Sequence, residues 1–211
     1  SVQKSSKSNS TFQGMYFIRR TLVWLQRFRH SRGMGIQSPF AYRFVRYVIN
    51  EHYPYYAYAD LRKHSARIGR KRLKLCRFYL RLTNYCQPRN VIDFAPYTEA
   101  YREYMSTGCN NAQITKLQET WDGETDGLPT PVDMARVSLK GRYEQFLDWA
   151  MGQTSDHSVF VIEHIHRDKD TRDYWARIIN DPRVGVTFDL YYCGVLFFDK
   201  KMYKRNYIIN F

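Results

Sequence analysis

The sequence lacks the features that mark secreted, zinc-binding and membrane-spanning proteins. Its four cysteines form no CxxC pair, so we expect them to be reduced thiols, mostly in the core: Cys76, Cys86, Cys109 and Cys193. No apolar run reaches the roughly 18 residues of a transmembrane helix. Residues 1–10 are polar and basic without the apolar centre of a secretion signal, and they predict a disordered arm. These absences predict a cytoplasmic protein without a transmembrane segment.

The first 81 residues also lack acidic side chains. They hold 18 Lys and Arg against Glu51 and Asp60, a net charge of +16 in a chain whose total is +13. A segment of this kind usually meets nucleic acid, anionic lipid or an acidic partner. The alternative is a solubilising face on an ordinary domain.

Hydrophobic periodicity predicts alternating helices and strands. Helical spacing of apolar residues predicts helices over 15–30, from Ser38-Pro39 onward, and over 60–86, 97–105, 143–151 and 171–179. Short apolar runs predict strands over 90–95, 112–117, 132–139 and 158–165, a β segment over 184–198 bent near Cys193-Gly194, and a last strand over 207–211. The alternation predicts a mostly parallel sheet that is covered on both faces. The helix over 15–30 could lie on an anionic membrane surface or dock on the core.

Four segments resemble a known family. They read SRGMGIQSPFAYRFV, FYLRLTNYCQPRNVIDFA, SVFVIEHIHRDKDTRDYWARI and VTFDLYYCGVLFF. The first is similar to the HGxHSPF segment of a group of bacterial class I SAM-dependent methyltransferase-like proteins, and the others are similar to their sheet strands and a Trp-bearing helix. The resemblance implies an α/β fold, a trimmed Rossmann-like methyltransferase sheet with helices on both faces and an N-terminal helical extension. We expect a disordered basic arm over 1–13, a basic helical region over 14–87 and the Rossmann-like domain over 88–211.

The cofactor loop departs from the family pattern. Asp93 matches the acidic residue at the end of the first strand, but Ala95, Pro96 and Tyr97 stand where the family has a glycine-rich turn, and Pro lacks a backbone donor. Gln118 falls at the position of the acidic residue that holds the ribose hydroxyls. These residues, Asp93, Ala95, Tyr97 and Gln118, would hold SAM if the protein is an active enzyme; otherwise we expect no cofactor.

One crossover of the usual fold is too short. Only residues 118–131 separate the second predicted strand from the third. A crossover helix with another strand and its linkers needs more residues. We therefore expect one strand and one or two helices of the usual fold to be missing.

The end of the strand over 158–165 carries the candidate catalytic residues, Glu163, His164 and His166. The two histidines alternate, so they would share one strand face and could act as a general base or, with Asp168, as metal ligands. No third ligand has a diagnostic spacing, so we expect no metal, and a hydrogen-bonded surface pair is the alternative reading.

A basic stripe is the candidate polyanion-binding site. Its members are spaced 4, 3, 4, 3 and 4 residues apart: Lys63, Arg67, Arg70, Lys74, Arg77 and Arg81. On one continuous helix they would form a single line of cations, which an anionic partner would neutralise. A solvated helix face is the alternative.

Three functions remain open from the sequence. The first is a degenerate methyltransferase-like protein, a pseudoenzyme with lost or weakened SAM binding that acts as a binding or assembly module through its basic face, with RNA favoured over DNA or lipid as the partner. The second is an active SAM-dependent methyltransferase with an unusual cofactor pocket. The third is an RNA- or membrane-surface-associated adaptor.

Overall fold

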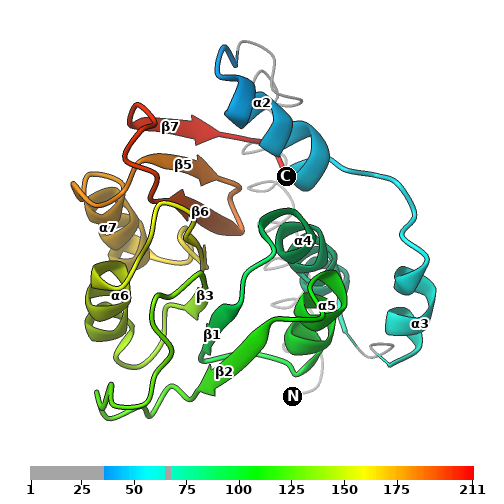
Figure 1. Ribbon diagram of the computed structural model, residues 1–211, viewed down its shortest axis with the longest axis horizontal. Coiled ribbons are helices and arrows are strands. Elements are labelled where there is room, and N and C mark those ends of the chain that lie inside the picture. The colour runs from blue at the N-terminus through cyan, green and yellow to red at the C-terminus, as the bar shows by residue number, and fades with distance from the viewer. Residues whose placement is uncertain (1–35, 65–67) are drawn as a thin grey trace, which may run out of the picture.

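The computed structural model describes residues 36–64 and 68–211, which form a seven-stranded sheet with helices on both faces (Figure 1). The helices are α2 (Pro39–Phe44), which continues into the π-helix η2 (Val45–Ile49), α3 (Ala57–His64), α4 (Arg70–Cys86), α5 (Ala100–Gly108), α6 (Tyr143–Gly152) and α7 (Lys169–Ile178). The strands are β1 (Asn90–Phe94), β2 (Gln113–Leu117), β3 (Met134–Ser138), β4 (Val159–Glu163), β5 (Val186–Asp189), β6 (Cys193–Phe197) and β7 (Arg205–Ile208).

The strand order is β2-β1-β3-β4-β6-β5-β7. Strands β1 to β4 run parallel, whereas β6 lies antiparallel to both β4 and β5. The prediction that β1 and β4 are buried, parallel strands of one sheet is confirmed, with β3 between them. The bend expected near Cys193-Gly194 is confirmed as a reversal of the chain, because β5 ends at Asp189 and the antiparallel β6 begins at Cys193.

Each face of the sheet has its own hydrophobic core. Strand residues alternate between the two cores, so Val91 belongs to one and Ile92 to the other. The first core includes residues of α2, η2, α4 and α5, and the second includes residues of α6 and α7 (Figure 1). We call these two sides the α4 face and the α6 face. The helices before residue 88 therefore share a core with the sheet.

The expected gap in the fold is present. Between β2 and β3 the chain forms neither helix nor strand, and β2 is an edge strand. The other edge is β7, which pairs in parallel with β5. The structure thus confirms the trimmed α/β architecture.

The sequence predicted the start of α2 correctly, but it predicted one continuous helix where the structure has α3 and α4. Ser38 caps α2 by accepting a hydrogen bond from the Ala41 N–H, with Pro39 at the first helical position, as the sequence predicts. The prediction of a single continuous helix over 60–86 is wrong, because α3 ends at His64 and α4 begins at Arg70. Gly69 has an extended backbone (φ −63°, ψ 154°), which cannot continue a helix. The arm over 1–13 and the helix over 15–30 lie outside the described residues.

No helix in the described ranges has the length and apolar composition needed to cross a membrane. All four cysteines are free, and Cys86 alone among them is only half-buried.

Candidate functional site

The carboxyl ends of the central parallel strands bring together a buried charge network, which consists of Asp93, Arg136, Glu163, Tyr79 and Tyr101. Asp93 of β1 and Arg136 of β3 are register partners, and Ser138 of β3 pairs with Glu163 of β4. Because side chains two apart on a strand share a face, all three charges point to the α4 face. Arg136 and Glu163 are 0% exposed and Asp93 is 2% exposed.

Arg136 is the centre of this network. Its Nε donates to Oδ1 of Asp93. Its Nη1 donates to Ser138 Oγ at 3.0 Å and to Glu163 Oε1 at 3.1 Å. Its Nη2 donates to the Phe94 carbonyl at 2.7 Å. The guanidinium therefore cross-links three adjacent strands at the end of the sheet where open α/β folds bind their ligands.

Two tyrosines from the covering helices complete the network. The Tyr79 hydroxyl of α4 donates to Glu163 Oε1 at 2.5 Å, and the Tyr101 hydroxyl of α5 donates to Oε2 at 3.4 Å. The Arg136 guanidinium lies 5.0 Å from the centre of the Tyr101 ring. Every buried side-chain polar atom in the described residues has a hydrogen-bond partner, so the protein's own groups satisfy these charges.

Burial sets the protonation of the network. It raises the pKa of Asp93, although the Arg136 charge acts to lower it. Burial acts to lower the pKa of Arg136, but the carboxylates of Asp93 and Glu163 raise it above its ordinary value. Burial and the Glu163 charge raise the pKa of both Tyr79 and Tyr101. The tyrosines are therefore neutral hydrogen-bond donors, and Arg136 stays charged.

The turn after β1 has a residue in the left-handed backbone conformation that usually requires glycine, but this residue is Ala95. Ala95 has a φ of +49°, in the left-handed region, and its N–H donates to the Leu117 carbonyl at 2.8 Å. A non-glycine residue there costs on the order of 1–2 kcal/mol. The Ala95 side chain packs into the α6-face core, and Pro96 follows it. The turn thus places side-chain atoms where a glycine turn would leave the backbone open.

Tyr97 covers the end of this turn. Its ring meets the His164 ring edge-on with centroids 5.1 Å apart. The Lys140 ammonium lies 4.4 Å from the ring centre, and the Arg72 guanidinium lies 5.5 Å from it. Tyr97 is thus held among cationic side chains next to the buried charge network.

Several solved structures resemble this architecture, among them two putative O-methyltransferases. No family model and no curated protein matches the sequence. A putative O-methyltransferase from Klebsiella pneumoniae has a TM-score of 0.51 at 8% identity, over 82% of this chain and 99% of its own. A putative caffeoyl-CoA O-methyltransferase from Staphylococcus aureus has a TM-score of 0.50 at 10% identity, over 68% of this chain and 93% of its own.

The fold is methyltransferase-like and Rossmann-like. At such low identities the likeness shows the fold alone. The buried charge network lies at the carboxyl ends of the central parallel strands of this methyltransferase-like sheet.

The predicted cofactor residues lie at the adjacent ends of β1 and β2, because the Ala95 N–H donates to the Leu117 carbonyl, one residue before Gln118. Asp93 is bound to Arg136, and Ala95 is buried in the α6-face core. Gln118 is exposed beyond the end of the edge strand β2, where its carbonyl accepts a hydrogen bond from the Trp121 N–H at 3.1 Å. Tyr97 packs against His164.

The expectation that the two histidines share a strand face is wrong. Strand β4 ends at Glu163, and His164 has a φ of +64° that turns the chain. His164 contacts Tyr97, whereas His166 Nε2 lies 2.7 Å from Asp189 Oδ2. Burial lowers the pKa of His164, so its neutral form dominates near pH 7. Among the residues described, no three His, Cys, Asp or Glu side chains are grouped to hold a metal.

The predicted basic stripe is also corrected. Lys63 lies on α3 and pairs with Asp60 at 2.9 Å, and Arg67 lies outside the described residues. Arg70, Lys74 and Arg77 are exposed on α4, as predicted. Arg81 is instead buried.

Arg81 has a structural role at the end of η2. Its Nε donates to the Val48 carbonyl at 2.7 Å, and its Nη2 donates to the Ile49 carbonyl at 3.3 Å. A cation at a helix C-terminus satisfies carbonyls that have no partner within the helix. This contact joins η2 to α4 and removes Arg81 from the surface.

Sequence reasoning missed Arg136, Tyr79 and Tyr101. One signal was available, because Arg136 lies at the centre of a short strand whose residues are all buried, and a fully buried arginine requires partners. The tyrosines gave no comparable signal, since their helical spacing is that of ordinary core residues.

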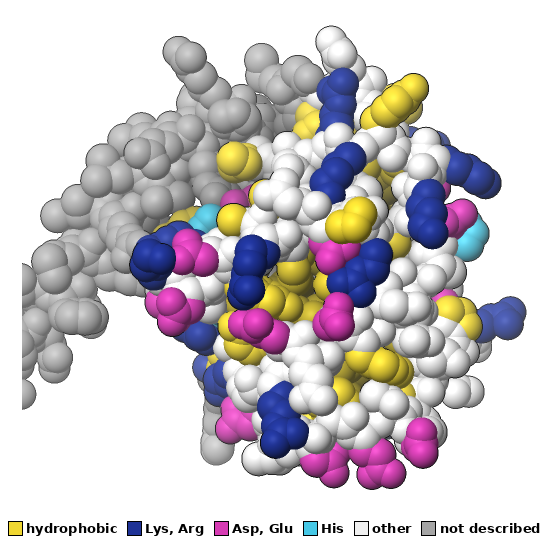
Figure 2. All heavy atoms as spheres, turned by 90° about the vertical axis from the view of Figure 1, so that its left-hand side faces the viewer, with side chains coloured by type: hydrophobic (Ala, Val, Ile, Leu, Met, Phe, Trp, Pro, Cys, Tyr) yellow, Lys and Arg dark blue, Asp and Glu magenta, His cyan; other side chains and the backbone are white. Residues whose placement is uncertain are grey.

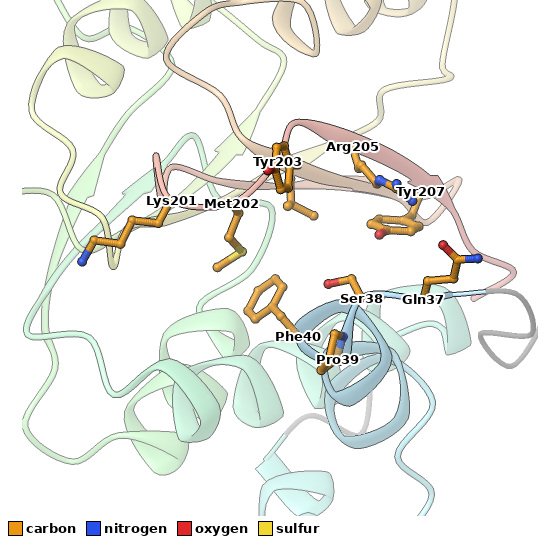
Figure 3. A pocket seen from close by; sticks show the side chains of 10 residues that line it. Gln37, Ser38, Pro39, Phe40, Lys201, Met202, Tyr203, Arg205 and Tyr207 are labelled. Carbon is orange, nitrogen blue, oxygen red and sulfur yellow. The ribbon is translucent and has the colours of Figure 1, made fainter.

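A surface pocket of about 360 Å³ lies away from the network, between the start of α2 and the chain leading into β7 (Figure 3). Phe40 and Met202 line it from opposite sides, and Arg205 and Tyr207 of β7 also line it.

Proposed function

We propose that this chain is a methyltransferase-like protein with lost or weakened SAM binding that acts as a binding module. The observation that carries the proposal is the bond between Arg136 and Asp93. The family resemblance assigns the cofactor to the acidic residue after the first strand and to the glycine turn. In this chain the acid is neutralised internally, and the turn is Ala-Pro-Tyr.

The cost of freeing Asp93 supports this proposal. Separating one partner from a buried ion pair costs about 3–5 kcal/mol, because the other charge stays buried without compensation. A ligand that needed Asp93 would lose affinity by a factor on the order of 10² to several 10³. The methyl group of Ala95 and the missing N–H of Pro96 add to this loss.

A calorimetric titration with SAM and with S-adenosylhomocysteine tests the proposal. We expect no binding at micromolar ligand. A micromolar Kd that the folded variant Asp93→Asn loses would contradict the proposal and favour an active methyltransferase with an unusual pocket. Circular dichroism of the variant separates lost binding from lost folding.

We propose in addition that the module binds a polyanion, RNA before DNA or lipid, through α4. The exposed Arg70 and Arg77 form no ion pair within the parts of the chain that the structure describes, and Lys74 is exposed between them. Arg77 lies 4.9 Å from the Tyr58 ring centre, and Lys74 lies 4.3 Å from that of Phe211, so aromatic rings position two of the cations.

Binding to RNA at two salt concentrations tests the polyanion proposal. Log affinity should fall linearly with log salt, and the double variant Arg70→Glu/Lys74→Glu should weaken binding to all sequences alike. RNA affinity that changes neither with salt nor in the double variant would contradict the proposal and mean that the cations of α4 are only solvated.

A further inference from the structure

The helix from α2 through η2 exposes only two kinds of side chain between Ala41 and Ile49. The apolar residues of this stretch are buried: Ala41, Phe44, Val45, Val48 and Ile49. The exposed positions alternate with them and are all Tyr or Arg: Tyr42, Arg43, Arg46 and Tyr47. We call these four residues the Tyr/Arg face.

The two tyrosines of this face are exposed. Tyr42 is 44% exposed and Tyr47 is 53% exposed. Neither ring packs against another aromatic ring or forms a hydrogen bond with a described residue. Single exposed apolar side chains are common, but two rings on one short face leave apolar surface in water that a polar residue would avoid. The connection that follows adds Tyr53 and Tyr56, which are 78% and 99% exposed.

The two arginines of this face are not neutralised by acids nearby in the sequence. Glu51 and Asp60 are the only acidic residues among the first 81. Glu51 accepts a hydrogen bond from the Tyr53 N–H at 2.8 Å, and Asp60 pairs with Lys63. Arg43 and Arg46 form no ion pair with any residue that the structure describes. The face therefore carries two positive charges between two flat rings.

We infer that the Tyr/Arg face is a binding surface for single-stranded RNA. Exposed aromatic rings stack on unpaired bases, and guanidinium groups pair with the phosphates between them. Bases in a duplex are already stacked on each other and offer no face to a tyrosine. This inference rests on the proposed polyanion function and narrows the partner to an unpaired strand.

The composition of the face disfavours a membrane as its occupant. A helix that lies on a bilayer inserts aliphatic and aromatic side chains below the headgroups. Every aliphatic residue of this stretch is buried in the protein core instead. The exposed tyrosines alone offer too little apolar surface to insert into a bilayer, whereas two rings are enough to stack on unpaired bases.

Fluorescence anisotropy with a labelled single-stranded oligouridine RNA tests the inference. Tyr42→Ser/Tyr47→Ser should weaken binding about tenfold or more, with an unchanged dependence on salt, because stacking releases no counterions. The matched variant Tyr42→Phe/Tyr47→Phe keeps both rings and should bind within about twofold of the parent. Arg43→Gln/Arg46→Gln should reduce the salt slope by about 1.4, from two lost phosphate contacts.

Three comparison probes separate this inference from the proposed polyanion function. Inorganic polyphosphate has charge but no bases, so the serine variant should bind it as tightly as the parent does. Duplex RNA and phosphatidylserine vesicles should both bind more weakly than the single strand. Loss of polyphosphate binding in the serine variant, no loss of RNA binding, or preference for the duplex or the vesicle would each overturn the inference.

If Arg70→Glu/Lys74→Glu weakens all anionic probes while the serine variant weakens none, the polyanion function stands and the Tyr/Arg face is refuted. If no anionic probe binds at low salt, both are refuted. Circular dichroism of each variant confirms folding, and the phenylalanine variant provides a second comparison should the serine variant unfold.

Discussion

The two faces of the sheet differ in whether certain surface arginines form ion pairs. On the α6 face, two surface arginines have acidic partners: Arg177 lies 3.4 Å from Glu144, and Arg183 lies 2.9 Å from Asp148. Figure 2 shows acidic and basic side chains interspersed over this side of the molecule. On the α4 face, Arg70 and Arg77 are exposed without an ion pair in the described ranges. The α6 side thus has surface ion pairs at Arg177 and Arg183, whereas Arg70 and Arg77 of α4 have no acidic partner among the described residues.

The two cores beneath these faces also differ in their content of charged side chains. The core under α6 and α7 is apolar, with the stacked rings of Phe94 and Phe146 4.6 Å apart. The core under α4 and α5 contains the buried charge network. Buried ion pairs add little net stability, but losing one partner is costly. The stability of the α4 side therefore depends on specific polar contacts, whereas that of the α6 side depends on apolar packing.

The largest expected effect comes from removing the centre of the network. Arg136→Met leaves Asp93 and Glu163 buried without their cation and should lower the free energy of unfolding by about 3–5 kcal/mol. The control Arg177→Met removes an exposed arginine from the α6 face and should cost less than about 1 kcal/mol. Urea unfolding of both variants measures the difference. Equal losses would show that the network does not distinguish the faces.

A second test concerns two arginines of one helix. Arg81→Met removes the charged donors from the Val48 and Ile49 carbonyls and should cost about 2–3 kcal/mol. Arg77→Met removes an exposed cation from α4 and should cost about 0.5 kcal/mol. Thermal unfolding compares the two. A small effect at Arg81 would contradict its role in joining η2 to α4.

A third test compares glycines at the ends of two helices. A methyl group at Gly108 of α5 would lie 2.2 Å from the Leu80 carbonyl oxygen, so Gly108→Ala should cost about 1–3 kcal/mol by forcing α5 away from α4. Gly152 of α6 has nothing within 4 Å of that position, so Gly152→Ala should be within about 0.5 kcal/mol of the parent. Denaturant midpoints measure both. A neutral Gly108→Ala would mean that α4 and α5 can separate freely.

The smallest expected effect is a pH dependence on the α6 side. Asp168 caps α7, and its hydrogen bonds to the Arg167 side chain and to the Thr171 N–H lower the pKa of its carboxyl group to about 2. Because the folded-state pKa lies below the ordinary value, this contribution is complete above about pH 4 and is lost as pH falls through 2. Unfolding curves from pH 5 to pH 2 should therefore converge for the parent and Asp168→Asn. A constant difference at all pH values would contradict this assignment.

Local patterns in the sequence predicted much of the fold. Apolar runs located the strands β1 to β4, and helical spacing located α6 and α7. The short link over 118–131 predicted the missing crossover, because chain length alone limits what it can form. The resemblance implied the methyltransferase-like class. Ser38 and Pro39 predicted the start of α2 through interactions within one turn.

The candidate site depended on contacts that no local pattern encodes. Arg136 meets Asp93 across 43 positions of sequence, and Tyr79 meets Glu163 across 84. Arg81 fits the periodicity of an exposed stripe, yet the packing of η2 against α4 buries it. His164 and His166 alternate as strand residues would, but β4 ends at Glu163, before either of them.

The sequence by itself therefore determined the order of the elements, the apolar sides of its strands and helices and the excess of positive charge near its start. Only the tertiary structure decided which charges are neutralised in the interior and which stay at the surface. The physical reason is that periodicity is a property of neighbouring residues, whereas the cost of burying a charge depends on partners that only the assembled sheet and helices bring within reach.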